Sequence, residues 1–223
     1  MRGQAVPSPE GLYLHIPFCD GKCAYCAFYS VRFSSMSADR YLAALALELK
    51  QPGAHGSLQS VKTLYIGGGT PTVLDPCQLS RLGGLLQTEV NLGAVEEVTL
   101  EANPGTLTRE KLRIVRSWGI NRISLGVQSF SDDVLLRLGR RHSSRDITAA
   151  CDLFRTEGVS NWGLDLIACI PGVSGRQWVR TLDQAIALDP CHISVYALTV
   201  EEGSRLHTRQ QHGDFRPLTG SRQ

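Results

Sequence analysis

The sequence predicts an α/β protein built on a parallel sheet that is either open or curled into a barrel. Short apolar segments alternate with helical patterns about six times along the 223 residues. The apolar segments are bounded by Gly, Pro or Asn, and nearly all of them run into glycine or polar residues at their carboxyl ends. Repeated βα units with this punctuation are typical of parallel sheets.

Six segments are predicted to be strands because they are short and rich in β-branched or aromatic residues. They are Leu12–Ile16, Val61–Ile66, Val95–Ala102, Asn121–Val127, Asn161–Ile167 and His192–Leu198. The carboxyl ends of parallel strands share one edge of the sheet, which is where such folds place their chemistry. The polar residues at these ends are therefore expected to meet.

Five helices are predicted between the strands from apolar residues at helical spacing. Their apolar positions are Leu42, Leu45 and Leu49; Leu79, Leu82 and Leu86; Leu112 and Val115; Ile147, Ala150 and Phe154; and Trp178, Leu182 and Ile186. Asp75, Thr108 and Ser143 are the predicted N-caps. The predicted stops are Pro52-Gly53, Gly119, Gly158 and Asp189-Pro190.

Composition narrows the class of protein. With 42% hydrophobic and 20% charged residues the chain is ordinary for a globular protein. At about 150 residues per domain, its length suggests one domain plus a tail. A formal net charge of +2 gives no reason to expect a nucleic-acid partner. No apolar stretch approaches the ~20 residues of a transmembrane helix, and the start lacks the apolar core of a secretory signal, so a cytoplasmic protein is expected.

The seven cysteines fall into two groups. Three are packed into Cys19-x-x-x-Cys23-x-x-Cys26, and the odd total without a secretory signal argues against a disulfide framework. The other four are predicted to be small buried hydrophobic residues, and they are Cys77, Cys151, Cys169 and Cys191.

The clustered thiols on one loop indicate a metal centre. A four-iron cluster held by Cys19, Cys23 and Cys26 would keep one iron open for a substrate or cofactor. A zinc site would need a fourth ligand such as His15 or a distant thiol, and no second C-x-x-C or H-x-x-x-H segment exists in the sequence. A redox pair of Cys23 and Cys26 would leave Cys19 without a role.

The segment Leu12-Tyr13-Leu14-His15-Ile16-Pro17-Phe18-Cys19, followed by the other two cysteines, resembles the radical S-adenosylmethionine (SAM) enzymes. It is most similar to the branch of oxygen-independent coproporphyrinogen III oxidases and HemW-like heme chaperones. Further motifs match that branch in order, and they are Gly67-Gly68-Gly69-Thr70-Pro71-Thr72, Gly126-Val127-Gln128-Ser129-Phe130, Leu138-Gly139-Arg140 and Asp165-Leu166-Ile167. The resemblance covers Leu12 to Gly203 and implies a partial TIM barrel of six βα units.

The resemblance also implies a domain organisation. Residues 1–203 would form the radical SAM core, with the cluster loop at residues 17–30. Residues 204–223 would be a polar, loosely ordered tail at the place where a C-terminal domain begins in the family, so the chain is expected to be truncated there. A local departure is Ala168-Cys169, where the family usually has an aromatic residue and glycine before Pro-Gly.

The chemistry implied by the resemblance uses a [4Fe–4S] cluster and SAM. The open iron would chelate SAM through its amino and carboxylate groups. An electron from the reduced cluster, received from a donor such as flavodoxin or ferredoxin, would split the sulfonium into methionine and a 5′-deoxyadenosyl radical. The implied SAM contacts are Gly68, Gly69, Thr70, Glu101 and Arg140 at the methionine end, Gln128 and Asp165 at the ribose, and Tyr13, Tyr25 and Ala197 near the adenine.

Taken singly, most of these residues also have an ordinary structural interpretation. Gly67–Gly69 could form a tight turn, Glu101 could be a solvated charge, Arg140 could be a surface cation and Gln128 could cap a helix. Asp165 is harder to explain in this way, because an unpaired carboxylate inside an apolar strand is costly.

Other notable side chains are predicted to be structural. Trp118, Trp162 and Trp178 are expected in the core. His15 is expected to have a structural role, and His142 is expected at the surface.

The residue type at position 28 distinguishes the oxidases from the heme chaperones of this branch. Two residues after the third cluster cysteine, the oxidases carry a fourth cysteine, whereas HemW-like proteins carry Phe, as this chain does. The resemblance therefore implies a heme chaperone that binds heme in porphyrin metabolism. The alternatives are an enzyme that decarboxylates the propionates of coproporphyrinogen III, and a non-catalytic metal-binding module.

Overall fold

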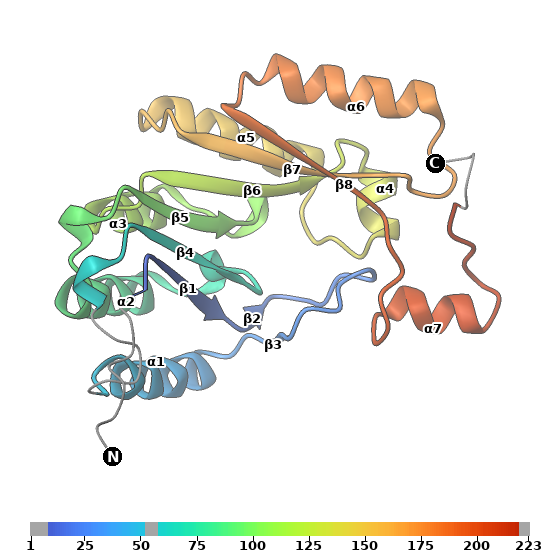
Figure 1. The fold of residues 1–223 in the computed structure, drawn as a ribbon. Coiled ribbons are helices and arrows are strands. Elements are labelled where there is room, and N and C mark those ends of the chain that lie inside the picture. The colour runs from blue at the N-terminus through green and yellow to red at the C-terminus, as the bar shows by residue number, and fades with distance from the viewer. Residues whose placement is uncertain (1–8, 52–57, 219–223) are drawn as a thin grey trace.

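The computed structural model describes residues 9–51 and 58–218. Six strands pair in parallel and in chain order. They are β1 (Gly11–Ile16), β4 (Thr63–Gly68), β5 (Glu97–Ala102), β6 (Arg122–Gln128), β7 (Trp162–Ala168) and β8 (His192–Ala197). Within the described residues β1 and β8 do not pair with each other, so the barrel is partial (Figure 1). The predicted fold class, a partial TIM barrel of six βα units, is confirmed.

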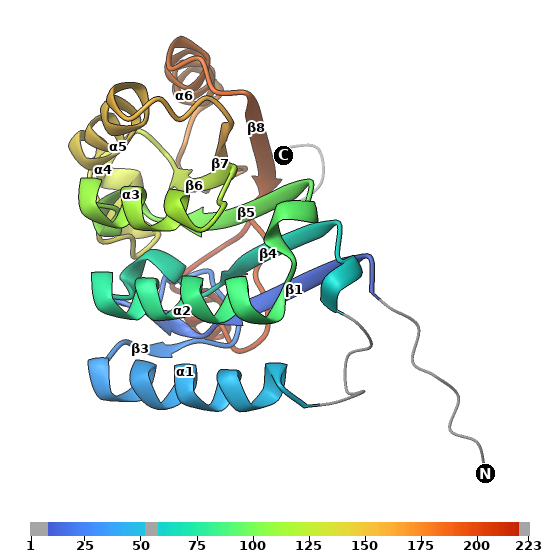
Figure 2. The ribbon, with the colours of Figure 1, turned by 90° about the vertical axis from the view of Figure 1, so that its left-hand side faces the viewer.

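Helices connect the strands and pack along one side of the sheet, as Figure 2 shows, except for the last helix, which follows the final strand and lies apart from this row (Figure 1). They are α1 (Ser35–Leu49), α2 (Pro76–Glu89), α3 (Arg109–Ser117), α4 (Asp132–Arg137), α5 (Ser144–Thr156), α6 (Gly175–Ala187) and α7 (Arg205–Gln211). Four 3₁₀ turns lie at Leu58–Ser60, Pro71–Val73, Leu92–Ala94 and Pro104–Thr106. A second, two-stranded sheet joins β2 (Phe18–Cys19) to β3 (Val31–Arg32).

The predicted helix ends are confirmed where the structure describes them. Asp75 and Ser143 form capping boxes, and the side chain of Thr108 accepts a hydrogen bond from the backbone N–H of Lys111. Gly119 adopts the left-handed conformation at φ +104°. The predicted stop at Pro52-Gly53 lies outside the described residues.

The main core lies between the sheet and the helices, and Trp178 packs against it from its edge. Trp118 and Trp162 are buried as predicted, but Trp178 is only half-buried. Its helix, α6, packs near β8, which is the edge strand and is mostly exposed.

The isolated cysteines also differ from the prediction that all are buried. Cys151 is fully buried, whereas Cys77 and Cys191 are exposed and Cys169 is half-exposed. Cys169 has φ +58°, so a side chain stands in a backbone conformation that favours glycine.

Residues 204–218 are more ordered than the expected loose tail. The side chain of Ser204 accepts from the backbone N–H of His207 and caps α7. Leu206 is 2% exposed and packs in a second apolar cluster with Ala24 and Leu138. Residues 219–223 lie outside the described part of the chain.

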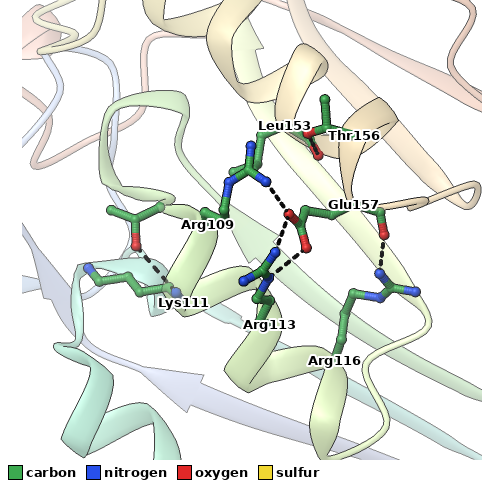
Figure 3. A network of polar contacts seen from close by, with 8 residues as sticks. Arg109, Lys111, Arg113, Arg116, Leu153, Thr156 and Glu157 are labelled. Atoms are coloured by element: carbon green, nitrogen blue, oxygen red, sulfur yellow. Dashed lines mark hydrogen bonds and ion pairs between the residues drawn. The ribbon is translucent and has the colours of Figure 1, made fainter.

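A network of arginines joins α3 to the end of α5 (Figure 3). Arg109 Nη1 lies 2.6 Å from Glu157 Oε1, and Arg113 Nε lies 2.8 Å from Glu157 Oε2. Arg116 donates to the backbone carbonyl of Glu157. Hydrogen bonding to Arg113 lowers the pKa of Glu157, which keeps this carboxylate ionised. The network fixes two neighbouring outer helices against each other.

No helix in the described ranges is long and apolar enough to cross a membrane.

Two adjacent glycines in α2 give a matched test of the packing. A Cβ at Gly83 would lie 2.5 Å from Cγ of Trp118, whereas a Cβ at Gly84 has no described atom within 4 Å. We expect Gly83→Ala to lower the free energy of unfolding by about 1–3 kcal/mol through overpacking. Gly84→Ala should raise it by up to about 1 kcal/mol, because alanine favours the helix. Urea unfolding followed by circular dichroism measures both, and equal effects would contradict the packing of α2 on Trp118.

Candidate functional site

A cavity of about 810 Å³ opens at the carboxyl ends of the strands and extends into the barrel. This volume is in the range of small-molecule sites. Twelve of the thirteen site residues predicted from the sequence line it. They are Cys19, Cys23, Cys26, Tyr25, Gly68, Gly69, Thr70, Glu101, Gln128, Arg140, Asp165 and Ala197.

Tyr13 is the predicted site residue that the structure does not bring to the cavity. Its ring stacks on Tyr65 at a centroid distance of 6.0 Å, and its side chain is 56% exposed. Its hydroxyl lies 3.2 Å from Nδ1 of His15. Tyr13 therefore lies beside the first strands, outside the cavity lining.

The loop that carries the three cysteines is fixed at both ends and in the middle. At its ends, Val31 N–H donates to the Pro17 carbonyl and Phe33 N–H to the Cys19 carbonyl. In the middle, Ala24 N–H donates to Leu138 O, and Leu206 N–H donates to Ala24 O, both at 2.8 Å. Figure 1 shows α7 beside this loop, away from the outer row of helices. The loop is thus held by elements from distant parts of the sequence.

The three loop thiols are free and half-exposed. The Thr70 hydroxyl lies 3.9 Å from Cys19 Sγ, and Arg140 Nη1 lies 3.4 Å from Cys23 Sγ. Burial raises the pKa of the Cys19 and Cys26 thiols, so binding of a metal centre must displace protons from them.

The positions of the donor groups bear on the two kinds of metal centre that the sequence left open, a four-iron cluster and zinc. In the described part of the chain, no group of three His, Cys, Asp or Glu side chains converges as the ligands of a single metal ion do. A four-iron cluster does not need this convergence, because each thiolate bonds to a different iron. His15, the alternative zinc ligand, has both ring nitrogens within hydrogen-bond distance of Tyr13 Oη and of the Tyr29 carbonyl. His15 therefore has the structural role expected of it.

The three glycines at the carboxyl end of β4 are required by close packing within the protein. A Cβ at Gly67 would lie 2.7 Å from Cδ of Glu101, and one at Gly69 would lie 2.5 Å from the Phe18 carbonyl oxygen. Gly68 has φ +112°, and a Cβ there would lie 2.4 Å from His15 Nδ1. Gly67 and Gly68 are the last residues of the strand, Gly69 forms the bend that follows, and Gly68 and Gly69 also line the cavity.

Two carboxylates lie inside the cavity. Glu101 accepts from the Tyr65 hydroxyl at 2.8 Å and from Gly68 N–H at 3.0 Å. Burial raises the pKa of Glu101, and the charge of Asp165 adds to this, despite those two hydrogen bonds. Asp165 accepts from the Ser124 hydroxyl at 2.9 Å. A cationic group of a ligand would relieve the repulsion and the desolvation of Glu101.

Arg140 is not the surface cation of the structural interpretation. Its guanidinium lies against Cys23, the side chain of Asn103, the Gly126 carbonyl and His142. Its buried Nε has no hydrogen-bond partner in the described part of the protein. Burial acts to lower the pKa of Arg140, but Tyr25 and Cys23 outweigh it, so the group stays charged. An enclosed cation with an unused donor is suited to an anionic ligand.

Asn103 is a site residue that the sequence analysis did not assign. Its Nδ2 donates to Thr70 Oγ1 at 2.8 Å, and its Oδ1 accepts from Arg140. Thr70 in turn contacts Cys19, so the polar chain from Arg140 through Asn103 reaches the cluster loop. Its place at the end of β5, in Glu101-Ala102-Asn103-Pro104, was the available signal.

The end of β6 has an unusual backbone. Gln128 has φ +68°, and the register between β6 and β7 shifts between Gly126 and Gln128. The N-cap of the following helix is Ser131, so the helix-cap interpretation of Gln128 is wrong. Non-glycine residues in this conformation are often found at functional sites.

Three further residues depart from or refine the expectations. His142 is buried, with 7% exposure, so the expectation that it lies at the surface is wrong. Tyr25 packs against the second apolar cluster, and its hydroxyl faces Cys23 and Arg140. Ala197 is the last residue of β8.

The profile of the Radical SAM superfamily matches residues 13–185. The heme chaperone HemW of Bacillus subtilis is 38% identical over 205 residues, which are 92% of this chain and 54% of that protein. HemW of Escherichia coli is 38% identical over 202 residues, covering 90% of this chain and 53% of that protein.

Similarity extends to solved structures. Coproporphyrinogen III oxidase (HemN) from Escherichia coli, described as a radical SAM enzyme, superposes with a TM-score of 0.77 at 31% identity. The match covers 87% of this chain and 45% of that protein. The chain thus spans about half the length of the curated relatives it matches.

The role of α7 in holding the cluster loop can be tested by hydrogen exchange. We expect Leu206→Ala to speed exchange of the amides in residues 19–30, because the cavity it leaves weakens the contact with Ala24. Thr208→Ala, at an exposed position of the same helix, should leave that exchange unchanged. Equal protection of the loop in both variants would show that α7 does not hold it.

His142 should make stability depend on pH. Burial and the charge of Arg140 lower its pKa from 6.5 to about 4 in the folded chain. The neutral imidazole contributes fully to stability above the pKa that His142 has in the unfolded chain. This contribution is lost as the pH falls toward the lower pKa of His142 in the folded chain. Relative to His142→Gln, the wild type should lose about 2 kcal/mol between about pH 7 and about pH 5, measured by urea unfolding. Parallel pH profiles would mean that His142 titrates normally.

Proposed function

Because the chain belongs to the radical SAM superfamily, we propose that it binds a [4Fe–4S] cluster and SAM and acts as a heme chaperone of the HemW kind. The observation that carries the proposal is that three thiols of one loop line the same cavity as an enclosed guanidinium with an unused donor. The cavity therefore combines a set of soft ligands for iron with a binding position for an anion.

Cys19, Cys23 and Cys26 would hold three irons of the cluster, and the fourth iron would be open to SAM. Thr70 and Arg140, which lie against Cys19 and Cys23, would donate hydrogen bonds to the cluster sulfurs. When bound and reduced by a donor such as flavodoxin or ferredoxin, the cluster supplies the electron that cleaves the sulfonium of SAM.

The methionine end of SAM has both a positive and a negative group, and the cavity offers a partner for each. Glu101, whose pKa is raised by burial, would accept from the ammonium group. The enclosed Arg140 would pair with the carboxylate. Gly68, Gly69 and Thr70, which line the cavity between them, would pack along the chain of methionine.

The nucleoside end would lie toward β6, β7 and β8. Gln128 and Asp165 would bind the ribose hydroxyls, since an amide and a carboxylate can both accept from them. Tyr25 and Ala197 line the cavity where the adenine would lie. Tyr13, which lies outside the lining, would act only indirectly, through His15 and Tyr65.

A heme ligand is supported by the similarity to HemW proteins and by Phe28. Phe28 is 73% exposed and borders the cavity. It occupies the position at which the coproporphyrinogen oxidases carry a fourth cysteine. The structural similarity to HemN favours a second candidate, decarboxylation of coproporphyrinogen III. A phenylalanine cannot supply the thiolate of a fourth cysteine, so we favour the chaperone.

Anaerobic reconstitution with iron and sulfide tests the cluster. We expect the wild type and Cys77→Ala, an exposed cysteine on α2, to gain the visible absorbance of an iron–sulfur cluster and matching iron and sulfide contents. Cys19→Ala, Cys23→Ala and Cys26→Ala should lose most of both, because a bound cluster needs these thiolates. Loading of the three variants equal to that of Cys77→Ala would overturn the proposed cluster site.

The reconstituted chain then distinguishes the two functions. With dithionite and SAM it should release 5′-deoxyadenosine or bind SAM measurably by calorimetry. Titration with heme should give a saturable spectral change, and coproporphyrinogen III should be recovered unchanged. Conversion of coproporphyrinogen III without heme binding would instead establish the oxidase.

A further inference from the structure

We propose that His142 is a positioning residue that holds Arg140 and the end of β6 in one fixed arrangement for SAM. The proposal rests on the proposed function, because Arg140 and Gln128 are the groups that would contact SAM. His142 is not itself among the groups assigned to SAM. Its role would be to orient two of them.

The position of the imidazole is tightly determined. His142 follows Arg140 by two residues and is 7% exposed. A Cβ added at Gly105 would lie 3.4 Å from Cβ of His142, so the turn after β5 packs directly against it. The side chain is therefore enclosed on this side by the turn after β5, while the residue also borders the cavity.

The hydrogen bonds determine the tautomer of the ring. Nε2 lies 3.2 Å from the Val127 carbonyl, which can only accept, so Nε2 carries the proton. Nδ1 lies 3.4 Å from Nη2 of Arg140, whose two protons also bond the nearer Asn103 and Gly126 oxygens, so the contact with Nδ1 is a shared one. A proton on Nδ1 would face this donor and its positive charge, so Nδ1 is the unprotonated nitrogen. A neutral imidazole is the form that can do both, and the lowered pKa of His142 is consistent with this form.

The same ring contacts the unusual backbone at the end of β6. Val127 precedes Gln128, which is held at φ +68°. Arg140 Nη2 donates to the Gly126 carbonyl at 2.8 Å, while His142 donates to the Val127 carbonyl. Two successive carbonyls of the strand are therefore held by Arg140 and His142, which also contact each other.

His142 would therefore couple the two protein groups that bind opposite parts of SAM. Arg140 would bind the carboxylate of SAM and Gln128 its ribose, and His142 sets the position of both. Leucine at position 142 would fill much of the space but would offer neither the acceptor for Arg140 nor the donor for Val127. Glutamine would offer both, through its amide oxygen and its amide nitrogen.

Binding of SAM and of decarboxylated SAM tests the link. The two ligands share the ribose, the adenine and the amine, and differ in the carboxylate that Arg140 would bind. On the reconstituted full chain, calorimetry should show that His142→Leu weakens SAM binding about tenfold or more. The same variant should lose much of the wild-type preference for SAM over the decarboxylated ligand, and His142→Gln should restore it.

The outcomes separate the two proposals. Failure of the reconstituted wild type to bind SAM overturns the proposed function. Wild-type affinity and wild-type preference in a folded His142→Leu chain overturn the positioning role alone, with cluster content as the check on loading.

A measurement on the wild type keeps the proposal testable if His142→Leu does not fold. In the ¹⁵N NMR spectrum of histidine-labelled protein, assigned with His142→Gln, His142 should be the neutral Nε2–H tautomer. A proton on Nδ1, or a ring that averages between tautomers, would overturn the inference.

Discussion

The guanidinium of Arg140 is the interaction on which the arrangement of the site depends. An enclosed charge is costly unless it is well hydrogen-bonded, and each partner of Arg140 belongs to a different segment. Cys23 belongs to the cluster loop, Asn103 to the turn after β5 and Gly126 to β6. None of these segments can shift without leaving a charge unsatisfied, so one side chain ties the loop of the three cysteines to the barrel.

The parts of this structure that could be predicted from the sequence are those with a local signal. Alternation of apolar strands with capped helices predicted the six-stranded sheet, and Asp75, Thr108 and Ser143 were recognisable N-caps because capping involves residues only three apart. Twelve of the thirteen proposed site residues line one cavity, because strand ends meet at one edge of a parallel sheet.

The rest depended on contacts between distant residues or on very short elements. The strand pair β2 and β3 has two residues in each strand, and α4 has six residues, too few to show a period. His142 is buried, and Asn103 connects Thr70 to Arg140, only because the fold packs the Arg140–His142 segment against the ends of β5 and β6. The sequence of α7 is polar apart from Leu206, which is the buried residue of this helix, so no apolar pattern predicted it.

The bond between Ala24 and Leu206 has a consequence for the order of events during synthesis. The three loop cysteines leave the ribosome near the start of the described chain, whereas the backbone amide that completes the hold on their loop comes near its end. Contacts of such long sequence separation form late in folding. The thiols therefore lie on an open loop until Leu206 has been synthesised, and oxidation or a competing metal can reach them before the site is assembled.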